Sequence, residues 1–191
     1  MSHANIYGLQ YISDYIDSAR ESELLEIIDA QPWLDDLKRR VQHYGYKYDY
    51  KARSIDSSMF LGPLPNWAAS LAEKLHSDGL FPQMADQLIV NEYEPGQGIS
   101  PHVDCEPCFD NTIASITLSS GCTMNFTKIE GGSKLSQYLE RRSIIILADE
   151  ALYSWRHSIK SRKYDEVNGN TIMRDRRVSL TFRNVLSQNV T

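Results

Sequence analysis

Five short strand-like segments in the second half of the chain constrain the fold most strongly. Turn sequences such as EPGQG, SSG and EGG separate them, and no helical pattern lies between them. A parallel doubly wound sheet would need a helix after each strand, so the pattern predicts a largely antiparallel sheet or jelly roll. The segments are rich in Ile, Val, Thr and Phe and cover residues 86–93, 112–119, 123–129, 142–149 and 176–185.

Two helical patterns precede these strands. Residues 20–33 and 64–79 place apolar side chains at helical spacing, and the second segment has Pro65 near its start and Gly79 at its end. The 191 residues favour a single domain. The order of the segments predicts an α+β fold: a double-stranded β-helix (jelly roll) buttressed by N-terminal helices.

The net charge of −5 argues mildly against a nucleic-acid partner, but the charge is unevenly distributed. Residues 38–53 hold six basic side chains, one acidic side chain and four tyrosines. Basic groups can meet phosphates and tyrosines can stack on bases, so this segment is a candidate nucleic-acid contact. Its tyrosines also alternate as on a half-buried strand, so a role in the core stays open, and Gly45 indicates a turn or a close approach.

Membrane insertion and secretion are not indicated. The chain has no apolar run of about 18 residues, and its N-terminus lacks the pattern of a signal peptide. Three cysteines, an odd number, do not suggest a disulfide scaffold and fit a reducing compartment. We therefore expect a cytoplasmic monomer with no membrane association.

A metal site is predicted at His102 and Asp104. On a strand, residues i and i+2 point to the same face, so both side chains of this pair could coordinate one metal ion. The best third ligand is His157, in YSWRHSI. Two imidazoles and one carboxylate on one face leave coordination positions open, as in non-haem Fe(II) oxygenases, although the residues alone fit zinc as well.

Other interpretations of these residues are weaker. His76 and Asp78 repeat the H-x-D spacing, but they lie at a predicted helix end, where i and i+2 do not face each other. Cys105 and Cys108 could form half of a zinc site, but only one further cysteine exists. The segment HVDCEPC also faintly resembles the zinc deaminase motif, although nothing completes a C-x-x-C after its proline.

The last strand has two chemically different faces. Arg177, Ser179, Thr181 and Arg183 share one face, while Val178, Leu180 and Phe182 share the other. We expect the polar face to line a cavity and the apolar face to pack in the core.

The order of these motifs identifies a family resemblance. The sequence NEYEPGQGISPHVD, a histidine at 157 and RRVSLTFR together resemble the AlkB family of Fe(II)- and 2-oxoglutarate-dependent dioxygenases, over about residues 87–185. RRVQHYGYKYDY, residues 39–50, looks like the AlkB-like domain of the tRNA-modifying branch. The resemblance implies Fe(II), 2-oxoglutarate and O2. It divides the chain into N-terminal helices and a substrate-recognition lid (1–85) and a catalytic jelly-roll core (86–191).

The resemblance also implies roles for individual residues. His102, Asp104 and His157 would hold the iron, and Arg183 would support the catalytic site beside the metal-binding carboxylate. Arg177 would bind the distal carboxylate of 2-oxoglutarate as a bidentate fork. The strand residues that would hydrogen-bond the cosubstrate are Asn91 and Tyr93.

The substrate is less constrained. The resemblance implies oxidative demethylation of alkylated bases in DNA or RNA; hydroxylation of a modified tRNA wobble base and a non-catalytic nucleic-acid-binding module are the alternatives. A base must leave its stack to reach a buried iron. The side chains expected to contact it are Glu106, Tyr44, Tyr46 and Arg40.

Overall fold

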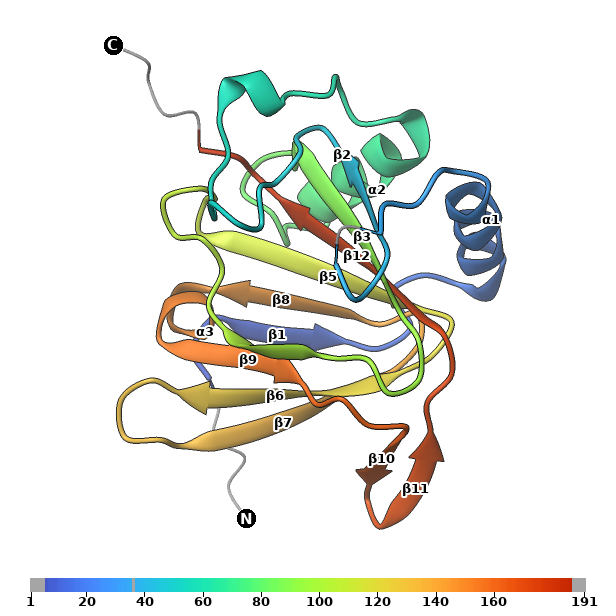
Figure 1. The fold of residues 1–191 in the computed structure, drawn as a ribbon, viewed down its shortest axis with the longest axis vertical. Coiled ribbons are helices and arrows are strands. Elements are labelled where there is room, and N and C mark those ends of the chain that lie inside the picture. Colours follow the sequence, from blue (N-terminus) through green and yellow to red (C-terminus); the bar gives the residue numbers. More distant parts are fainter. Residues whose placement is uncertain (1–5, 36, 187–191) are drawn as a thin grey trace.

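Two antiparallel sheets face each other in the computed structural model, which describes residues 6–35 and 37–186 (Figure 1). The six-stranded sheet has the order β1-β8-β5-β12-β3-β2, the four-stranded sheet has the order β4-β9-β6-β7, and β10 and β11 form a separate hairpin. This is the predicted jelly-roll arrangement. The strands are β1 (Leu9–Ile12), β2 (Val41–Tyr44), β3 (Gln87–Tyr93), β4 (Ile99–His102), β5 (Thr112–Leu118), β6 (Cys122–Lys128), β7 (Lys134–Leu139), β8 (Ile144–Ala148), β9 (Trp155–Ile159), β10 (Tyr164–Val167), β11 (Asn170–Met173) and β12 (Arg177–Arg183).

The two predicted helices are present as α1 (Ser18–Asp29) and α2 (Asn66–Ser77). The side chain of Asp17 caps α1 by accepting a hydrogen bond from the backbone of Arg20 at 2.8 Å. Short helical turns occur at η1 (Ser57–Met59) and α3 (Asp149–Tyr153). Within the described ranges, no helix combines the length and the apolarity needed to cross a bilayer.

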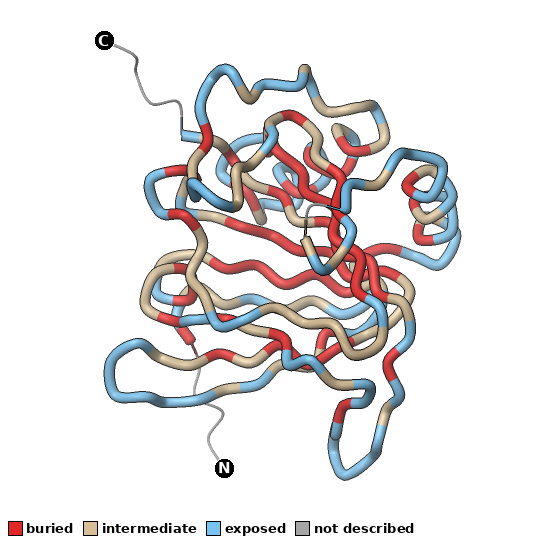
Figure 2. The backbone as a smooth tube through the Cα atoms, viewed as in Figure 1, coloured by how far each residue is buried: buried red, intermediate tan, exposed pale blue. Residues whose placement is uncertain are grey.

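Buried residues follow the strands of the large sheet (Figure 2), and apolar side chains pack on both of its faces. One face packs on α1 and α2, with Leu24 and Leu75 fully buried among strand residues such as Leu180. The opposite face packs on the small sheet through side chains such as Phe126 and Ile145. The cavity described below opens on this second side, between the two sheets.

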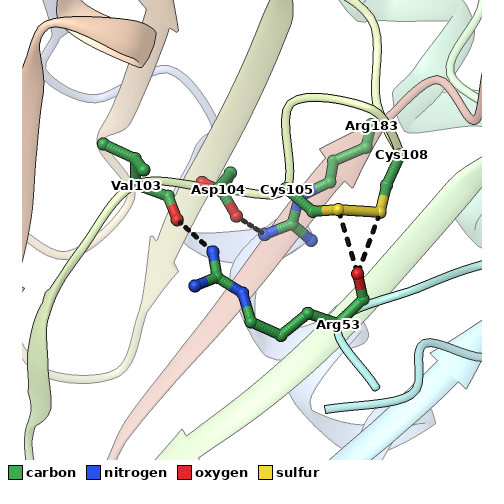
Figure 3. Close-up of a disulfide and its surroundings, with 6 residues drawn as sticks. All are labelled: Arg53, Val103, Asp104, Cys105, Cys108 and Arg183. Atoms are coloured by element: carbon green, nitrogen blue, oxygen red, sulfur yellow. Dashed lines mark hydrogen bonds and ion pairs between the residues drawn. A yellow bond between two sulfur atoms is a disulfide. The ribbon is translucent and has the colours of Figure 1, made fainter. Parts of the chain in front are cut away.

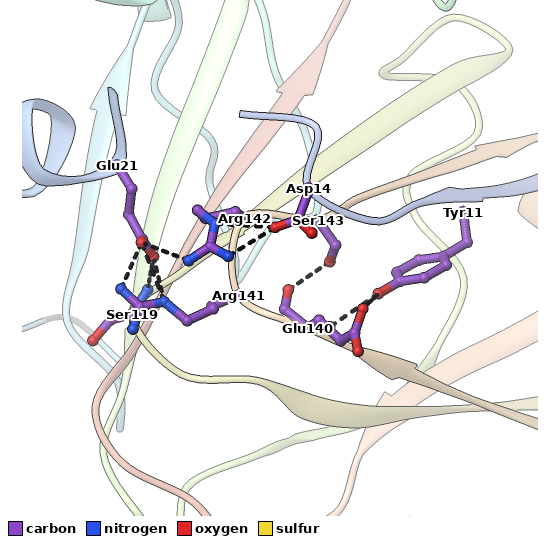
Figure 4. Close-up of polar contacts among 8 residues, drawn as sticks. All are labelled: Tyr11, Asp14, Glu21, Ser119, Glu140, Arg141, Arg142 and Ser143. Atoms are coloured by element: carbon purple, nitrogen blue, oxygen red, sulfur yellow. Dashed lines mark hydrogen bonds and ion pairs between the residues drawn. The ribbon is translucent and has the colours of Figure 1, made fainter. Parts of the chain in front are cut away.

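Helix α1 is tied to the sheets by a buried carboxylate, that of Glu21 (Figure 4). It pairs with Arg141 at 2.6 Å and with Arg142 at 3.8 Å, and it accepts a hydrogen bond from the backbone of Ser119 at 2.8 Å. A buried carboxylate is costly without such partners, so this network fixes where α1 meets the turn between β7 and β8.

The N-terminal part contributes more sheet than the sequence predicted. β1 lies at one edge of the large sheet, paired with β8, and β2 lies at the other edge, paired with β3. The expected division into N-terminal helices before residue 86 and strands after it is therefore incomplete. β7 and β9 were also not predicted, and β4 was expected only as a strand carrying both His102 and Asp104; all three belong to the small sheet.

Candidate active site

Three potential metal ligands meet between the sheets. His102 ends β4 and lies directly opposite His157 of β9, with the two ring centroids 4.3 Å apart. The ligand atoms of His102, Asp104 and His157 all lie within 4.8 Å of one another. Asp104 follows β4 instead of lying in it. The expected strand alternation therefore does not bring His102 and Asp104 together; the loop after β4 does.

The protonation states of this cluster suit a metal cation. Burial lowers the pKa of His157 to about 4, so its ring is neutral at pH 7. Burial would raise the pKa of Asp104, but positive charge nearby, above all that of Arg183, outweighs it and holds that pKa at about 2. The cluster therefore offers an ionised carboxylate and a neutral imidazole with a lone pair.

Neighbouring groups orient these ligands. Arg183 donates to Oδ1 of Asp104 at 2.9 Å, and Oδ2 lies 3.6 Å from Nε2 of His157. Nδ1 of His102 lies 2.8 Å from the carbonyl oxygen of Ser100, which can only accept, so Nδ1 carries the proton and Nε2 carries the lone pair. The donor set fits the facial arrangement of two histidines and one carboxylate that holds Fe(II).

The polar face of β12 lines a cavity of about 310 Å³ next to this cluster, as its alternation predicted. Arg177 is buried, donates to Thr117 at 2.9 Å and lies over the ring of Tyr93, with its Cζ 5.4 Å from the centroid. Its Nε has no hydrogen-bond partner among the described residues. Asn91 and Tyr93 line the cavity from the adjacent strand β3, so a guanidinium and two polar side chains converge there.

Arg39 was not predicted as a site residue, yet it lines the same cavity. Its Nε donates to Oδ1 of Asn91 at 2.9 Å, and its Cζ lies 5.7 Å from the ring centroid of Tyr93 and 5.9 Å from that of Tyr50. Because Oδ1 of Asn91 accepts from Arg39, the amide N–H groups of Asn91 are left to donate into the cavity. No sequence signal distinguished Arg39 from its neighbour Arg40.

Tyrosines of the segment 45–61 do reach the cavity, but not the two that were expected. Tyr48 and Tyr50 line it, together with Arg53. Burial raises the pKa of Tyr50 to about 12, and its hydroxyl has no partner among the described residues. At neutral pH this hydroxyl is therefore a donor available to a ligand.

The residues expected to contact the substrate are not among the described residues that line the cavity. Tyr44 packs edge-on against Trp67 with a centroid distance of 5.3 Å, and the ring of Tyr46 lies 5.0 Å from that of Phe60. β2 ends at Tyr44, so the expected strand alternation does not continue through the later tyrosines. Arg40 pairs with Glu92 at 2.5 Å, and Glu106 is exposed in the turn after Asp104.

Gly45 makes the close approach that its position suggested. Its φ is +78°, and a Cβ there would come within 1.9 Å of the carbonyl oxygen of Asp86. Only glycine fits this place, so Gly45 sets where the segment 45–61 leaves the sheet.

The odd cysteine count did not predict a disulfide, but the structure pairs Cys105 with Cys108 (Figure 3). Their turn follows Asp104 directly, and Cys105 lines the cavity. Both sulfur atoms face the backbone carbonyl of Arg53, at 3.2 and 3.5 Å.

Comparison with known proteins agrees with this geometry. The family model described as 2OG-Fe(II) oxygenase superfamily matches residues 28–183. The "Alkylated DNA repair protein ALKBH8 homolog" of Arabidopsis thaliana is 38% identical, over 96% of this chain and 60% of that protein. The "tRNA (carboxymethyluridine(34)-5-O)-methyltransferase ALKBH8" of Mus musculus is 37% identical, over 84% of this chain. This chain spans only 25% of that mouse protein.

A solved structure supports the fold independently. The protein described in "The structure of OsALKBH1" superposes with a TM-score of 0.68, covering 93% of this chain and 96% of that one. The two chains are 14% identical, so the likeness shows the fold alone.

Proposed function

Because this chain belongs to the 2OG-Fe(II) oxygenase superfamily, as an AlkB-type dioxygenase that uses Fe(II), 2-oxoglutarate and O2, we propose that it oxidatively demethylates alkylated bases in DNA or RNA. The observation that carries the proposal is one cavity in which three metal ligands face a wall of tyrosine and arginine side chains. Rings can stack on an extruded base, and guanidinium groups can meet its phosphates.

Each part of the cavity has a distinct proposed task. His102, Asp104 and His157 hold Fe(II), which when bound supplies the oxidation of a C–H bond with 2-oxoglutarate and O2. Arg183 keeps Asp104 ionised and oriented. Arg177 binds the distal carboxylate of 2-oxoglutarate, and Asn91 and Tyr93 hydrogen-bond the same molecule.

The lid side of the cavity is proposed to hold the base. Tyr48 and Tyr50 supply aromatic faces, and Arg39 and Arg53 supply positive charge at the same wall. Hydroxylation of an N-methyl group then gives a hydroxymethyl product, which releases formaldehyde and leaves the free amine.

A second substrate class is favoured by one specific observation. The mouse relative, 37% identical, is named for carboxymethyluridine at position 34 of tRNA. The methyltransferase reaction in that name is not carried over, because this chain spans a quarter of that protein. Hydroxylation of a modified tRNA uridine by the same cavity is therefore the second candidate.

Incubating the Fe(II)-loaded protein and 2-oxoglutarate in air with N-methylated oligonucleotides, and separately with tRNA, tests both candidates. Formaldehyde with a demethylated nucleoside supports the first; a hydroxylated tRNA nucleoside without formaldehyde supports the second. His102→Ala should abolish either product, whereas His76→Ala, at the end of α2, should not. Absence of succinate and of any changed nucleoside with both substrates would refute the proposal.

A further inference from the structure

The cysteine pair beside the metal ligands has no task in the proposed reaction. Cys105 and Cys108 are joined in the turn that follows Asp104 (Figure 3). Both residues are largely buried, but Cys105 lines the cavity, so a small reagent can approach its sulfur through the cavity mouth. Cys105 and Cys108 therefore connect the loop that carries Asp104 to the groups that pack against the two sulfur atoms.

The group that packs there is the backbone carbonyl of Arg53, 3.2 Å from the sulfur of Cys105 and 3.5 Å from that of Cys108. A thiol carries a hydrogen and can donate to this oxygen, whereas a disulfide sulfur carries none. The oxidation state of the pair therefore decides whether the Arg53 carbonyl receives hydrogen bonds from the two sulfur atoms.

Arg53 holds a segment that forms one wall of the cavity. The segment 45–61 contributes Tyr48, Tyr50 and Arg53 to the lining. The Arg53 side chain also donates to the carbonyl of Val103 at 3.2 Å. Ile55 lies in one buried apolar cluster with Cys105 and Cys108, so polar and apolar contacts together join the segment to the 103–108 loop.

The backbone of Arg53 adds to the argument. Its φ is +51°, in the left-handed region that non-glycine residues seldom adopt. Such a conformation persists where surrounding contacts hold it, and here it is present with the disulfide formed. Hydrogen bonds from two thiols to the Arg53 carbonyl would hold it more firmly.

We propose that Cys105 and Cys108 form a thiol–disulfide modification site that controls how firmly the segment 45–61 docks over the cavity. In the dithiol form both S–H groups donate to Arg53 and hold the wall more firmly than the disulfide does. On oxidation, both S–H bonds break and one S–S bond forms. A disulfide oxidant such as oxidised glutathione accepts the two electrons and two protons and becomes two thiols.

Thiol alkylation tests whether the site exists. The full metal-free chain is equilibrated anaerobically in buffers of varied reduced and oxidised glutathione, then alkylated and digested for mass spectrometry. We expect Cys105 and Cys108 to lose alkylation together as the buffer becomes oxidising. Cys122, a buried free thiol on β6, is the internal reference, because it should stay a thiol throughout.

Limited trypsin digestion tests the docking, because Lys47, Lys51 and Arg53 are exposed cleavage sites in the segment. The disulfide form should be cut there roughly fivefold faster than the dithiol form, as expected for losing weak hydrogen bonds. Cys105→Ser with Cys108→Ser keeps two donors but cannot oxidise, so it should be cut slowly in both buffers. The matched double alanine variant should be cut fast in both. Cys122→Ala should behave as the unmodified chain.

The proposal also predicts a change in turnover, and that part rests on the proposed function: the disulfide form should show a higher KM for the nucleic-acid substrate. Failure to turn over any nucleic acid, with cleavage still responding to glutathione, would refute the proposed function alone. Two results would overturn the modification site itself. One is independent or absent oxidation of the two cysteines; the other is equal cleavage of the dithiol and disulfide forms.

Discussion

At the residue scale, the site depends on arginines that differ in what they touch. Arg177 lies buried in the cavity, whereas its neighbour Arg176 pairs with Asp29 and Glu92 outside it. Likewise, Arg39 bonds to Asn91 and lines the cavity, whereas Arg40 pairs with Glu92 and is not among the described lining residues. Arg177 and Arg39 thus each have a matched control one position away in the chain.

Arg177→Lys should raise the KM for 2-oxoglutarate about tenfold or more, because a lysine is a point charge and cannot form the two parallel hydrogen bonds of a guanidinium. Succinate formation at varied 2-oxoglutarate measures this. Arg176→Lys should leave that KM unchanged. Equal values for the two variants would show that Arg177 is not the anchor.

Arg39→Gln should raise the KM for 2-oxoglutarate roughly fivefold, because the charge-assisted bond that orients the Asn91 amide is lost. Iron affinity, measured by anaerobic titration, should not change, since Arg39 makes no bond to the three metal ligands. The control is Arg40→Gln. A shift of similar size in that control would place the effect in the local fold instead of the cavity.

At the element scale, β12 was the most predictable strand and the small sheet the least. β12 is central in the large sheet, with one face toward the cavity and the other toward the core. Polar and apolar residues therefore alternate along its sequence, RVSLTFR. Strands β4 and β9 are short, and they are defined by pairing across more than 50 residues, which no local pattern records. The tyrosine segment was predicted in part: the strand ends at Tyr44, so its alternation could not indicate that Tyr48 and Tyr50 reach the cavity.

The β10–β11 hairpin carries a buried ion pair that makes its stability depend on pH. Asp165 is buried and pairs with Arg174 at 2.5 Å and with Arg162. Burial would raise its pKa, but hydrogen bonds from Arg174 and Arg162 outweigh it and lower the pKa to about 2. Since this pKa is below that of the unfolded chain, the stabilisation is present above about pH 4 and is lost as the pH falls toward 2.

Asp165→Asn should therefore lower the free energy of unfolding by about 2 kcal/mol at pH 7, and by less with each step below pH 4. Urea unfolding followed by circular dichroism from pH 3 to pH 7 measures the difference. Glu166→Gln, at an exposed neighbouring position, should change stability by no more than about 0.5 kcal/mol. A pH-independent loss in Asp165→Asn would contradict the linkage.

At the scale of the whole molecule, the proposed metal ligands join elements that are distant in the sequence. His102 and Asp104 flank the end of β4, while His157 lies on β9. A bound ion holds all three together in the folded chain and finds no such site in the unfolded one, so binding should stabilise the fold.

Mn(II), a redox-stable substitute for Fe(II), should with 2-oxoglutarate raise the Tm by about 5 to 10 °C at 100-fold excess over the Kd. Differential scanning fluorimetry measures the shift. His102→Ala should remove most of it, and His76→Ala should keep it. An equal shift in both variants would mean that the ion binds elsewhere.

The two halves of the proposed chemistry belong to different sheets. The two histidines proposed to bind the metal lie on the small sheet, whereas Arg177 and Asn91 lie on the large one. Side chains packed between the sheets, such as Phe126 and Ile145, would therefore set the distance from a bound metal to the proposed cosubstrate anchor. The distance between the sheets therefore affects how tightly 2-oxoglutarate consumption is coupled to oxidation of the substrate. If the distance between the sheets changes while every ligand stays in place, 2-oxoglutarate can be consumed without oxidation of a base. The ratio of succinate to modified nucleoside would then report how the two sheets pack.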